Sequence, residues 1–487
     1  MSDDLPHRLR DALETADFTH DAVTSLLGVD AHRALERNQT VPARRRTTGG
    51  SPLETLTRLF LLQLAVPREQ AERALPGLVD ELGVAGLLAT SVGEVAARTD
   101  CRPYAVTDPD GTRTDGWLVS DLTPGMDGRP HHVGTDHVLG VSSASTSLAQ
   151  LTLRHDVTDA LDLGTGCGVQ AFHLAGHADR VVATDVNPRA LWAARFNADL
   201  NDLRGVEVRD GSFFEPVRGE RFDLITTNPP FVISPATGER LVYRDSGIPG
   251  DRVVEDIVRR APDHLRPGGW CQVLANWAHL DGVGWDERIA GWLAPGTDAL
   301  VVQREVLDPA AYVELWLADA GVSGATDGAE RDRRYDTWLS WFDEQGITGV
   351  GFGWINLRTD GSGRRELLDW PWDVEQPVAP AIAAWGAARV GVGPDDTLRL
   401  AADVQQETVG LPGAEDPESV VLRRRTGLRR ARRVDTATAA VVGACDGDLR
   451  VGQILDAVAR ILGEDADTLA ARLLPELGEL AAEGYLL

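Results

Sequence analysis

The chain has 487 residues, 43% of them hydrophobic, which is enough for about two to four domains with sizeable cores and excludes general disorder. Its net charge is −27 and its basic residues are all arginine, so the chain has no overall attraction to nucleic acid, although a local basic patch would still bind a polyanion. No apolar run is long enough for a membrane span and the N-terminus lacks the regions of a signal peptide, so a cytoplasmic protein is expected.

The four cysteines are scattered, and none of them forms a Cys-x-x-Cys pair. This spacing argues against both a disulfide framework and a zinc site.

Residues 1–130 are predicted to form a mainly helical N-terminal domain. Ser51-Pro52 is a strong helix start, since serine caps the first backbone N–H groups and proline suits the first turn. The expected order is three helices and then a hairpin, which is the order of a winged helix. The helices are expected at 53–64, 67–75 and 78–88, and the hairpin strands at 104–107 and 116–120, joined by the turn 108–111.

Residues 131–360 alternate strand and helix patterns, which predicts an α/β domain with a parallel sheet and helices on both faces. Seven strands are expected, at 159–163, 180–185, 206–209, 223–227, 270–275, 300–306 and 350–357. Helices are expected between them, at 169–175, 188–200, 253–265, 285–293 and 310–320.

Residues 361–487 are predicted to form a second winged-helix-like domain, with helices at 451–462 and 468–483. This region carries the one strongly basic run of the chain, residues 423–433. A solvated strand face or a patch that neutralises acids is the more common role of such a run, and an RNA site is the alternative.

A glycine-rich turn, Gly164-Thr-Gly-Cys-Gly168, follows an apolar strand and opens a helix. Glycine lets the backbone turn sharply and approach a ligand closely. A dinucleotide fingerprint needs Gly-x-Gly-x-x-Gly, and Val169 occupies the position of its third glycine, which disfavours NAD and FAD.

Two acidic residues follow the next strands. Asp185 ends the second strand, where a carboxylate can accept hydrogen bonds from both hydroxyls of a ribose, and Asn187 is the better cap for the helix at Pro188. Asp210 follows the third strand in an Asp-Gly turn.

The sharpest signal is Asn228-Pro-Pro-Phe231, which ends the fourth predicted strand. Two prolines stiffen the backbone and remove two N–H donors, so the Asn228 side-chain oxygen and the Pro229 carbonyl are left to accept hydrogens from a target NH₂ group. Such a grip orients the nitrogen lone pair, and Phe231 can stack on a flat target.

Together these motifs resemble those of class I S-adenosylmethionine (SAM) dependent methyltransferases that modify planar nitrogens. Among them are the release-factor glutamine methyltransferases, the ribosomal RNA guanine-N2 and adenine-N6 methyltransferases, and the adenine-N6 DNA methyltransferases. The resemblance covers roughly residues 135–360 and implies a Rossmann-like sheet of seven strands whose last strand is antiparallel. It also implies that Asp210 accepts a hydrogen bond from the adenine amino group and that Phe213 or Phe214 covers the adenine ring.

The resemblance implies two groups of site residues. The catalytic group is Asn228, Pro229, Pro230 and Phe231. The group that binds SAM is Asp162, Gly164, Thr165, Gly166, Gly168, Asp185, Asn187, Asp210, Gly211, Ser212 and Phe213.

Residues 131–137 contain three histidines, but no carboxylate or cysteine cluster supports a metal, and methyl transfer from SAM needs none. A loop or a lid facing the substrate is expected there instead, and residues 138–146 are expected to cross the mouth of the cofactor site. Most of the tryptophans after residue 269 are expected in cores or interfaces, with one or two lining the target pocket.

Three functions remain open. The first is methylation of a glutamine side chain on a protein of the translation machinery, which the acidic surface and a loose similarity of Tyr243–Gly247 to the glutamine enzymes favour. The second is methylation of an exocyclic amine of RNA, favoured by the flanking domains and the arginine run. The third is a non-catalytic SAM-binding regulator, which the intact Asn-Pro-Pro-Phe sequence opposes.

Overall fold

The computed structural model describes residues 4–107, 111–129, 133–235, 247–320, 324–359, 362–388, 391–412 and 417–487. Contacts divide the chain into two compact units, residues 1–149 with 154–370, and residues 371–487 with 150–153. The predicted boundaries at residues 130 and 360 stay a prediction. None of the described helices is long and apolar enough to cross a membrane.

The first unit begins with a helical region that has its own apolar core. Its elements are α1 (Leu5–Thr15), α2 (His20–Glu36), α3 (Val41–Arg46), α4 (Pro52–Leu56), η1 (Thr57–Leu61), β1 (Val66–Pro67), α5 (Arg68–Ala74), α6 (Val79–Val84), β2 (Leu88–Ser91), β3 (Glu94–Ala97), β4 (Thr99–Thr107), β5 (Arg113–Asp121) and η2 (Met126–Gly128). The predicted start at Ser51 is confirmed, because Ser51 and Glu54 form a capping box at the N-terminus of α4.

A short hairpin that the sequence analysis did not predict, β2–β3, follows α6 and pairs with β1 in a small sheet of order β1-β3-β2. The hairpin expected at 104–107 and 116–120 comes next and is confirmed, because both strands lie within the longer antiparallel hairpin β4–β5. Its turn residues 108–110 lie outside the described residues. The winged-helix assignment of this region stays a prediction.

The β4–β5 hairpin packs on the α/β region that follows it, because Trp117 and Val119 share a core with Phe196 and Leu200 of the helix α9 (Pro188–Leu200). Two amide side chains of this region form hydrogen bonds with backbone groups of β5. Asn201 accepts from the backbone N–H of Trp117 at 2.8 Å and donates to its carbonyl at 2.7 Å. The hairpin is therefore a fixed wall of the α/β region.

The α/β region follows the predicted alternation of strands and helices. Its elements are α7 (Ser143–Leu151), β6 (Val157–Leu163), α8 (Val169–Leu174), β7 (Ala178–Asp185), α9, β8 (Val206–Asp210), η3 (Glu215–Val217), β9 (Phe222–Thr227), α10 (Arg252–Arg260), η4 (Ala261–His264), β10 (Leu265–Leu280), α11 (Trp285–Ala290), β11 (Asp298–Leu307), α12 (Pro309–Asp319), α13 (Gly324–Gln345), β12 (Ile347–Arg358) and β13 (Arg365–Asp369).

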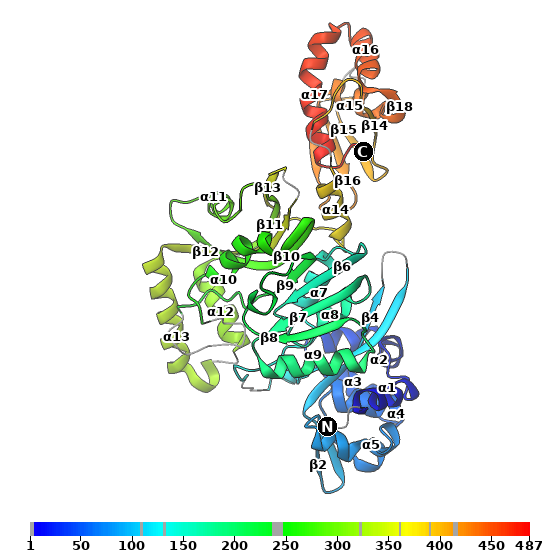
Figure 1. Cartoon of the computed structure of the whole chain (residues 1–487), viewed down its shortest axis with the longest axis vertical. Coiled ribbons are helices and arrows are strands. Elements are labelled where there is room, and N and C mark those ends of the chain that lie inside the picture. Colours follow the sequence, from blue (N-terminus) through cyan, green and yellow to red (C-terminus); the bar gives the residue numbers. More distant parts are fainter. Residues whose placement is uncertain are drawn as a thin grey trace. The chain divides into compact units, whose positions relative to one another are not determined.

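These strands form one sheet of order β13-β11-β12-β10-β9-β6-β7-β8 (Figure 1). The strand β12 is antiparallel to both of its neighbours, and the other pairs are parallel. The predicted α/β fold with an antiparallel last core strand is confirmed, and β13 adds an eighth strand at the edge beside β11. The order reverses between β6 and β9, which is where ligands bind in open sheets of this kind.

The second unit has its own core and two small sheets. Its elements are α14 (Ala379–Ala387), β14 (Thr397–Arg399), β15 (Val404–Val409), β16 (Ser419–Arg424), β17 (Ala431–Val434), α15 (Thr436–Gly443), β18 (Asp446–Arg450), α16 (Val451–Leu462) and α17 (Ala466–Ala482). The strands β15, β16 and β17 form an antiparallel sheet and β14 pairs with β18. The two predicted helices are present as α16 and α17, and the winged-helix reading of this unit stays a prediction.

Candidate functional site

The glycine turn and the Asn-Pro-Pro-Phe turn begin side by side. Their strands, β6 and β9, are parallel neighbours, and Leu163 pairs with Thr227 at the last position of the ladder. The Thr227 hydroxyl donates to the Leu163 carbonyl at 2.7 Å, which fixes the two strand ends together. Gly164 and Asn228 are the next residues of each chain segment, so both turns leave the same edge of the sheet.

A hollow of about 520 Å³ lies at this edge, and we call it the sheet-edge hollow. Its volume is within the range of small-molecule sites. Its lining combines the two turns with the ends of β7 and β8 and with the segment 135–140. Among the lining residues are Asp162, Gly164, Thr165, Gly166, Asp185, Asn187, Gly211, Ser212, Phe213, Asn228, Pro229, Pro230 and Phe231.

The glycine turn is held by two carboxyl groups, those of the buried Asp162 and the half-buried Asp185. Gly164 and Gly166 adopt positive φ angles of 77° and 57°, which disfavour a side chain. Asp162 accepts from the Thr165 hydroxyl at 2.5 Å and from the Ala171 N–H at 3.1 Å, both on Oδ2. Oδ1 of Asp162 accepts no hydrogen bond from the described residues. Burial raises the pKa of Asp162 to about 7.

Asp185 ends β7 inside the hollow. Its carboxylate accepts from the Gly166 N–H at 3.0 Å and from the Asn187 N–H at 2.9 Å. Burial raises the pKa of Asp185, and these backbone hydrogen bonds act against that rise. Asn187 caps α9 by accepting from the Arg189 N–H at 3.0 Å, as its position before Pro188 indicates. Because Asn187 fills the capping role, the remaining lone pairs of Asp185 are available to a ligand.

The strand β8 ends at Asp210, and the residues that follow Asp210 line the hollow. Asp210 pairs with Asp185 in the ladder between β8 and β7 but is itself exposed and is not one of the lining residues. Of the two phenylalanines considered for the adenine ring, Phe213 lines the hollow. Phe214 is buried and stacks on His264, with ring centroids 4.4 Å apart, so it belongs to the core.

Gly168 lies just outside the lining. It has a φ of 88°, and a Cβ there would come 3.5 Å from the backbone of Ala194 in α9. That distance is an ordinary van der Waals contact, so the positive φ is what favours glycine at this position.

The Asn-Pro-Pro-Phe turn presents an acceptor that no protein group uses. Oδ1 of Asn228 is buried, and it accepts no hydrogen bond from the described residues. A buried polar atom without a partner is costly, so such an atom in a ligand hollow indicates a polar ligand group. Phe231 lines the same hollow and contacts Trp316 edge-to-face at 6.2 Å between centroids.

Several residues that the sequence analysis singled out lie outside the described residues or do not line the sheet-edge hollow. His131, His132 and residues 243–246 lie outside the described residues, so neither the histidine run nor the Tyr243–Gly247 similarity can be placed. Among the residues that are described, no group of three or more His, Cys, Asp or Glu is arranged to hold a metal ion. No tryptophan is among the residues that line the sheet-edge hollow, so the target-facing tryptophans expected from the sequence are not found there.

Three of the seven arginines in the run at 423–433 form ion pairs with acids of the second unit. Arg423 bonds Glu407 at 2.7 Å, Arg424 bonds Asp403 at 2.8 Å, and Arg432 bonds Glu483 at 2.9 Å. These contacts support the acid-neutralising role and weaken the case for an RNA site.

Thr135 and His137 line the sheet-edge hollow, and they belong to the segment expected as a loop or a lid facing the substrate. Val138, Leu139 and Gly140 also line it, and they belong to the segment 138–146 that was expected to cross the mouth of the cofactor site. The sequence analysis missed the contact of this segment with β5, because no local pattern indicates it.

Residues 140–281 match the family described as the methyltransferase small domain. These residues form a methyltransferase small domain. The resemblance inferred from the motifs is thereby confirmed for this part of the chain. Residues 15–98 match a second family, described only as a domain of unknown function (DUF7059).

Curated relatives match the small domain over short stretches. A release factor glutamine methyltransferase of Xylella fastidiosa is 38% identical over 128 residues, which is 24% of this chain and 46% of the relative. That of Geobacter sulfurreducens is 36% identical over 143 residues, 27% of this chain and 48% of the relative. The ribosomal RNA small subunit methyltransferase C of Cronobacter sakazakii is 32% identical over 173 residues, 33% of this chain and 44% of the relative.

The chain therefore spans about half the length of the curated relatives that it matches. A solved structure of the T. thermophilus 16S rRNA N2 G1207 methyltransferase with AdoMet and guanosine is 18% identical. That match covers 46% of this chain and 57% of the other, with a TM-score of 0.26. The fold assignment above stands on the strand order of the sheet itself.

Proposed function

We propose that this chain is a SAM-dependent N-methyltransferase that transfers a methyl group to a planar amide or amine nitrogen. The proposal rests on one observation above all, the unpartnered Oδ1 of Asn228 in the hollow that also contains the glycine turn. Such an acceptor, fixed by two prolines, suits the NH₂ group of a flat target.

The residues of the sheet-edge hollow fit SAM. The glycine turn gives close backbone approach for the methionyl part, the free lone pairs of Asp185 suit a ribose diol, and Phe213 offers an apolar ring for the adenine. When bound, SAM supplies an electrophilic methyl group on a sulfonium.

The chain's own part in the reaction is to orient the acceptor and to stabilise its developing charge. The nitrogen donates its hydrogens to Asn228 Oδ1 and to the Pro229 carbonyl, so its lone pair points to the methyl group. As the N–C bond forms, the bond from the methyl carbon to the sulfonium sulfur would break, and its electron pair would stay on sulfur. The nitrogen would become positive, and both oxygens would stabilise that charge. The proton leaves the nitrogen afterwards, so no strong base is needed before transfer.

We favour a glutamine side chain of a translation protein as the acceptor. Several of the relatives are named as glutamine methyltransferases acting on release factors or on ribosomal protein uL3. Arg423, Arg424 and Arg432 of the arginine run pair with acids, which weakens the main feature in favour of RNA. A cytoplasmic location is part of the same proposal.

An exocyclic amine of ribosomal RNA is the second candidate, because a relative named for ribosomal RNA methylation matches the same domain. The two can be separated by incubating the protein and radiolabelled SAM with ribosomes, isolated rRNA and release factors. Label that resists protease and is lost to ribonuclease would overturn the glutamine assignment. Label in a release factor that is located to glutamine by mass spectrometry would support it.

Replacing Asn228 tests the catalytic role of the turn. We expect Asn228→Ala to bind SAM with an affinity within about twofold of the original, and to transfer methyl groups about 10²–10³-fold more slowly, since one preorganised acceptor is lost. Isothermal titration and a single-turnover assay measure the two effects.

The matched control is Thr226→Val, which also removes a buried and unpartnered oxygen, two residues earlier on β9 and away from the hollow lining. It should keep full transfer. Equal transfer rates in both variants would exclude the role of Asn228. SAM binding without any methyl transfer by the original chain would favour a SAM-binding regulator over an enzyme.

A further inference from the structure

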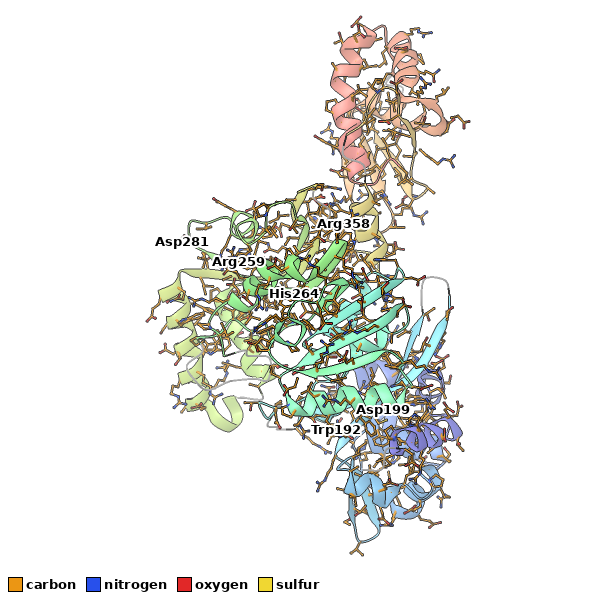
Figure 2. The ribbon with its side chains drawn as sticks, in the orientation of Figure 1. Trp192, Asp199, Arg259, His264, Asp281 and Arg358 are labelled. Atoms are coloured by element: carbon orange, nitrogen blue, oxygen red, sulfur yellow. The ribbon has the colours of Figure 1, made fainter. Side chains whose placement is uncertain are left out.

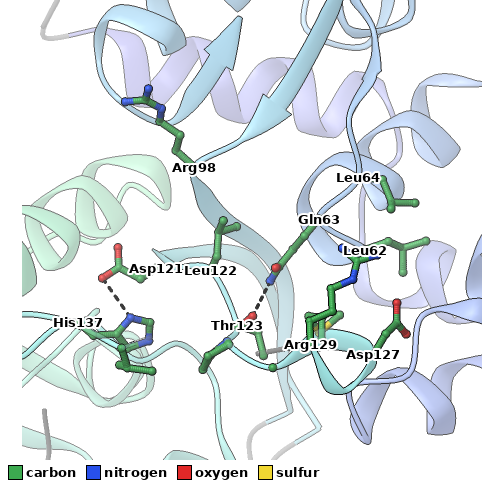
Figure 3. A pocket seen from close by; sticks show the side chains of 14 residues that line it. Leu62, Gln63, Leu64, Arg98, Asp121, Leu122, Thr123, Asp127, Arg129 and His137 are labelled. Atoms are coloured by element: carbon green, nitrogen blue, oxygen red, sulfur yellow. Dashed lines mark hydrogen bonds and ion pairs between the residues drawn. The ribbon is translucent and has the colours of Figure 1, made fainter. Parts of the chain in front are cut away.

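One wall of the sheet-edge hollow is built by a segment, residues 135–140, that lies outside the helices and strands. His137, Val138, Leu139 and Gly140 line this hollow, and Val138 is buried against Val169 and other apolar residues. His137 also lines a second hollow of about 370 Å³, beside the end of β5, which we call the hairpin hollow. Figure 3 shows the hairpin hollow, with the side chains of Asp121 and His137 in contact with each other at one side of it.

Asp121, the last residue of β5, holds this segment from outside the sheet-edge hollow. Its backbone N–H donates to the Val138 carbonyl at 3.1 Å, and its Oδ2 accepts from the Val138 N–H at 2.8 Å. Oδ2 also lies 3.6 Å from Nδ1 of His137. The segment is thus bonded to Asp121 through both main chain and side chain.

The same carboxylate is tied to α9. Its Oδ1 accepts from the guanidinium of Arg189, and the Asp121 side chain is only 13% exposed. Charge-assisted bonds of this kind are stronger than neutral ones, and partial burial reduces their screening by solvent. Asp121, which belongs to the hairpin, therefore forms hydrogen bonds with both the segment and the N-terminus of α9.

Two further contacts keep the segment in the same place. Nδ2 of Asn187 donates to the Asp136 carbonyl at 2.8 Å. Gly140 passes so close to β5 that a Cβ on it would lie 2.5 Å from the Ser120 hydroxyl. Ser120 and Asp121 are consecutive residues, so the end of β5 determines where the segment lies relative to the glycine turn.

We propose that Asp121 is a positioning residue for the SAM site, which it does not line: it fixes segment 135–140 as a wall of the sheet-edge hollow. This inference rests on the proposed function. It assigns the β4–β5 hairpin, which lies outside the matched small domain, an indirect part in retaining the cofactor, through the segment 135–140.

The physical consequence concerns dissociation more than association. Without the carboxylate, the Val138 N–H loses its partner and, among the described residues, the Arg189 guanidinium keeps only the Asp136 carboxylate, 3.5 Å away. The segment then gains freedom to move away from the hollow. A bound cofactor then loses contacts on one side and leaves faster.

The test compares Asp121→Ala and Asp121→Asn in the full chain. We expect Asp121→Ala to raise the SAM Kd about tenfold, mainly through a faster dissociation rate. Asp121→Asn keeps an oxygen for the Val138 N–H but loses the charge that faces Arg189, so its Kd should lie between those of Asp121→Ala and the original chain. The control is Asp115→Ala on the same strand, whose exposed carboxylate pairs with Arg113 and touches no part of the segment; its Kd should not change.

A second measurement needs no cofactor. Hydrogen exchange of the amides in segment 135–140, without SAM, should be about tenfold faster in Asp121→Ala than in Asp115→Ala. Should Asp121→Ala fail to fold, Gly140→Ala displaces the same segment from Ser120 and is expected to raise the SAM Kd as well.

The outcomes separate the two proposals. If the original chain binds no SAM, the proposed function is wrong, and the exchange rates still decide the role of Asp121. If the original chain binds SAM, and Asp121→Ala or its substitute Gly140→Ala binds it equally well with unchanged exchange, the positioning role of Asp121 is overturned.

Discussion

At the scale of single residues, the carboxyl group of Asp162 is the most informative in the sheet-edge hollow. It is buried at the end of β6, its pKa is raised to about 7 by burial, and Asp185 lies close enough to add to that rise. An acid with this pKa is largely neutral at pH 6 and largely ionised at pH 8.

Binding of a sulfonium should favour the ionised form of Asp162. We therefore expect the SAM Kd to fall as pH rises from 6 to 8, by about tenfold for each unit by which binding lowers the pKa of this group. Titrations at several pH values measure the slope, and Asp162→Asn should flatten it. Asp199→Asn, an exposed position on α9 in Figure 2, is the control and should keep the slope.

The stability of the ligand-free chain should show the opposite trend for this group. A carboxyl whose folded pKa lies above its ordinary value of 3.8 contributes stability that is complete below that value and is lost as pH rises through about 7. A lower melting temperature at pH 8 than at pH 6, with Asp162→Asn reducing the difference, would agree with this. A pH-independent SAM Kd in the original chain would contradict the role given to Asp162.

At the scale of elements, α9 connects the β4–β5 hairpin with the glycine turn. The Asn197 side chain is 2% exposed and makes three hydrogen bonds. It accepts from the Val119 N–H at 2.8 Å, and donates to the carbonyls of Val119 at 2.9 Å and Cys167 at 2.7 Å. Cys167 is part of the glycine turn, so one side chain ties hairpin, helix and turn together.

Replacing Asn197 by alanine should therefore affect both stability and binding. We expect a loss of about 2–4 kcal/mol in the free energy of unfolding, since three buried backbone groups lose their partner. We also expect weaker SAM binding, since the turn loses the bond at Cys167. Denaturant unfolding and SAM titration measure the two effects.

The matched control for Asn197 is Asn201→Ala, one helical turn further on. Asn201 bonds Trp117 in a similar way but makes no bond to the glycine turn. It should lower stability and leave SAM affinity unchanged. Equal SAM affinity in both variants would show that the hydrogen bond from Asn197 to the Cys167 carbonyl does not contribute to SAM binding.

At the scale of the whole molecule, every residue that lines the sheet-edge hollow belongs to the first compact unit. We therefore expect a chain shortened to residues 1–370 to bind SAM with a Kd within about twofold of the full chain. Titration of both proteins measures this. The expectation fails if the shortened chain folds but binds SAM much more weakly, because the second unit would then support the hollow.

The shortened chain also tests whether the second unit takes part in recognising the methyl acceptor. If it binds SAM normally but no longer methylates a release factor or rRNA that the full chain modifies, the second unit takes part in acceptor recognition. Its core of buried residues and its own paired charges give it the features of an independently packed body.

The sequence by itself determined the strand ends and the turns that leave them. Positive-φ glycines, a capping Asn187 before Pro188, and two prolines after Asn228 act through the backbone within a few residues, so their geometry follows from local chemistry. Alternating strand and helix patterns likewise fixed the α/β order, since each depends on the spacing of apolar residues in one segment.

Only the tertiary structure decided which residues meet. It placed Phe213 in the hollow and Phe214 in the core, left Asp210 outside the lining, added β13 at the sheet edge, and set Asp121 and Asn197 as links between distant segments. Asn197 and Val119 are 78 residues apart in sequence, and the pattern around either residue contains no sign of the other. Such contacts arise when packed elements bring unsatisfied backbone groups within reach of a side chain, and no local pattern encodes that meeting.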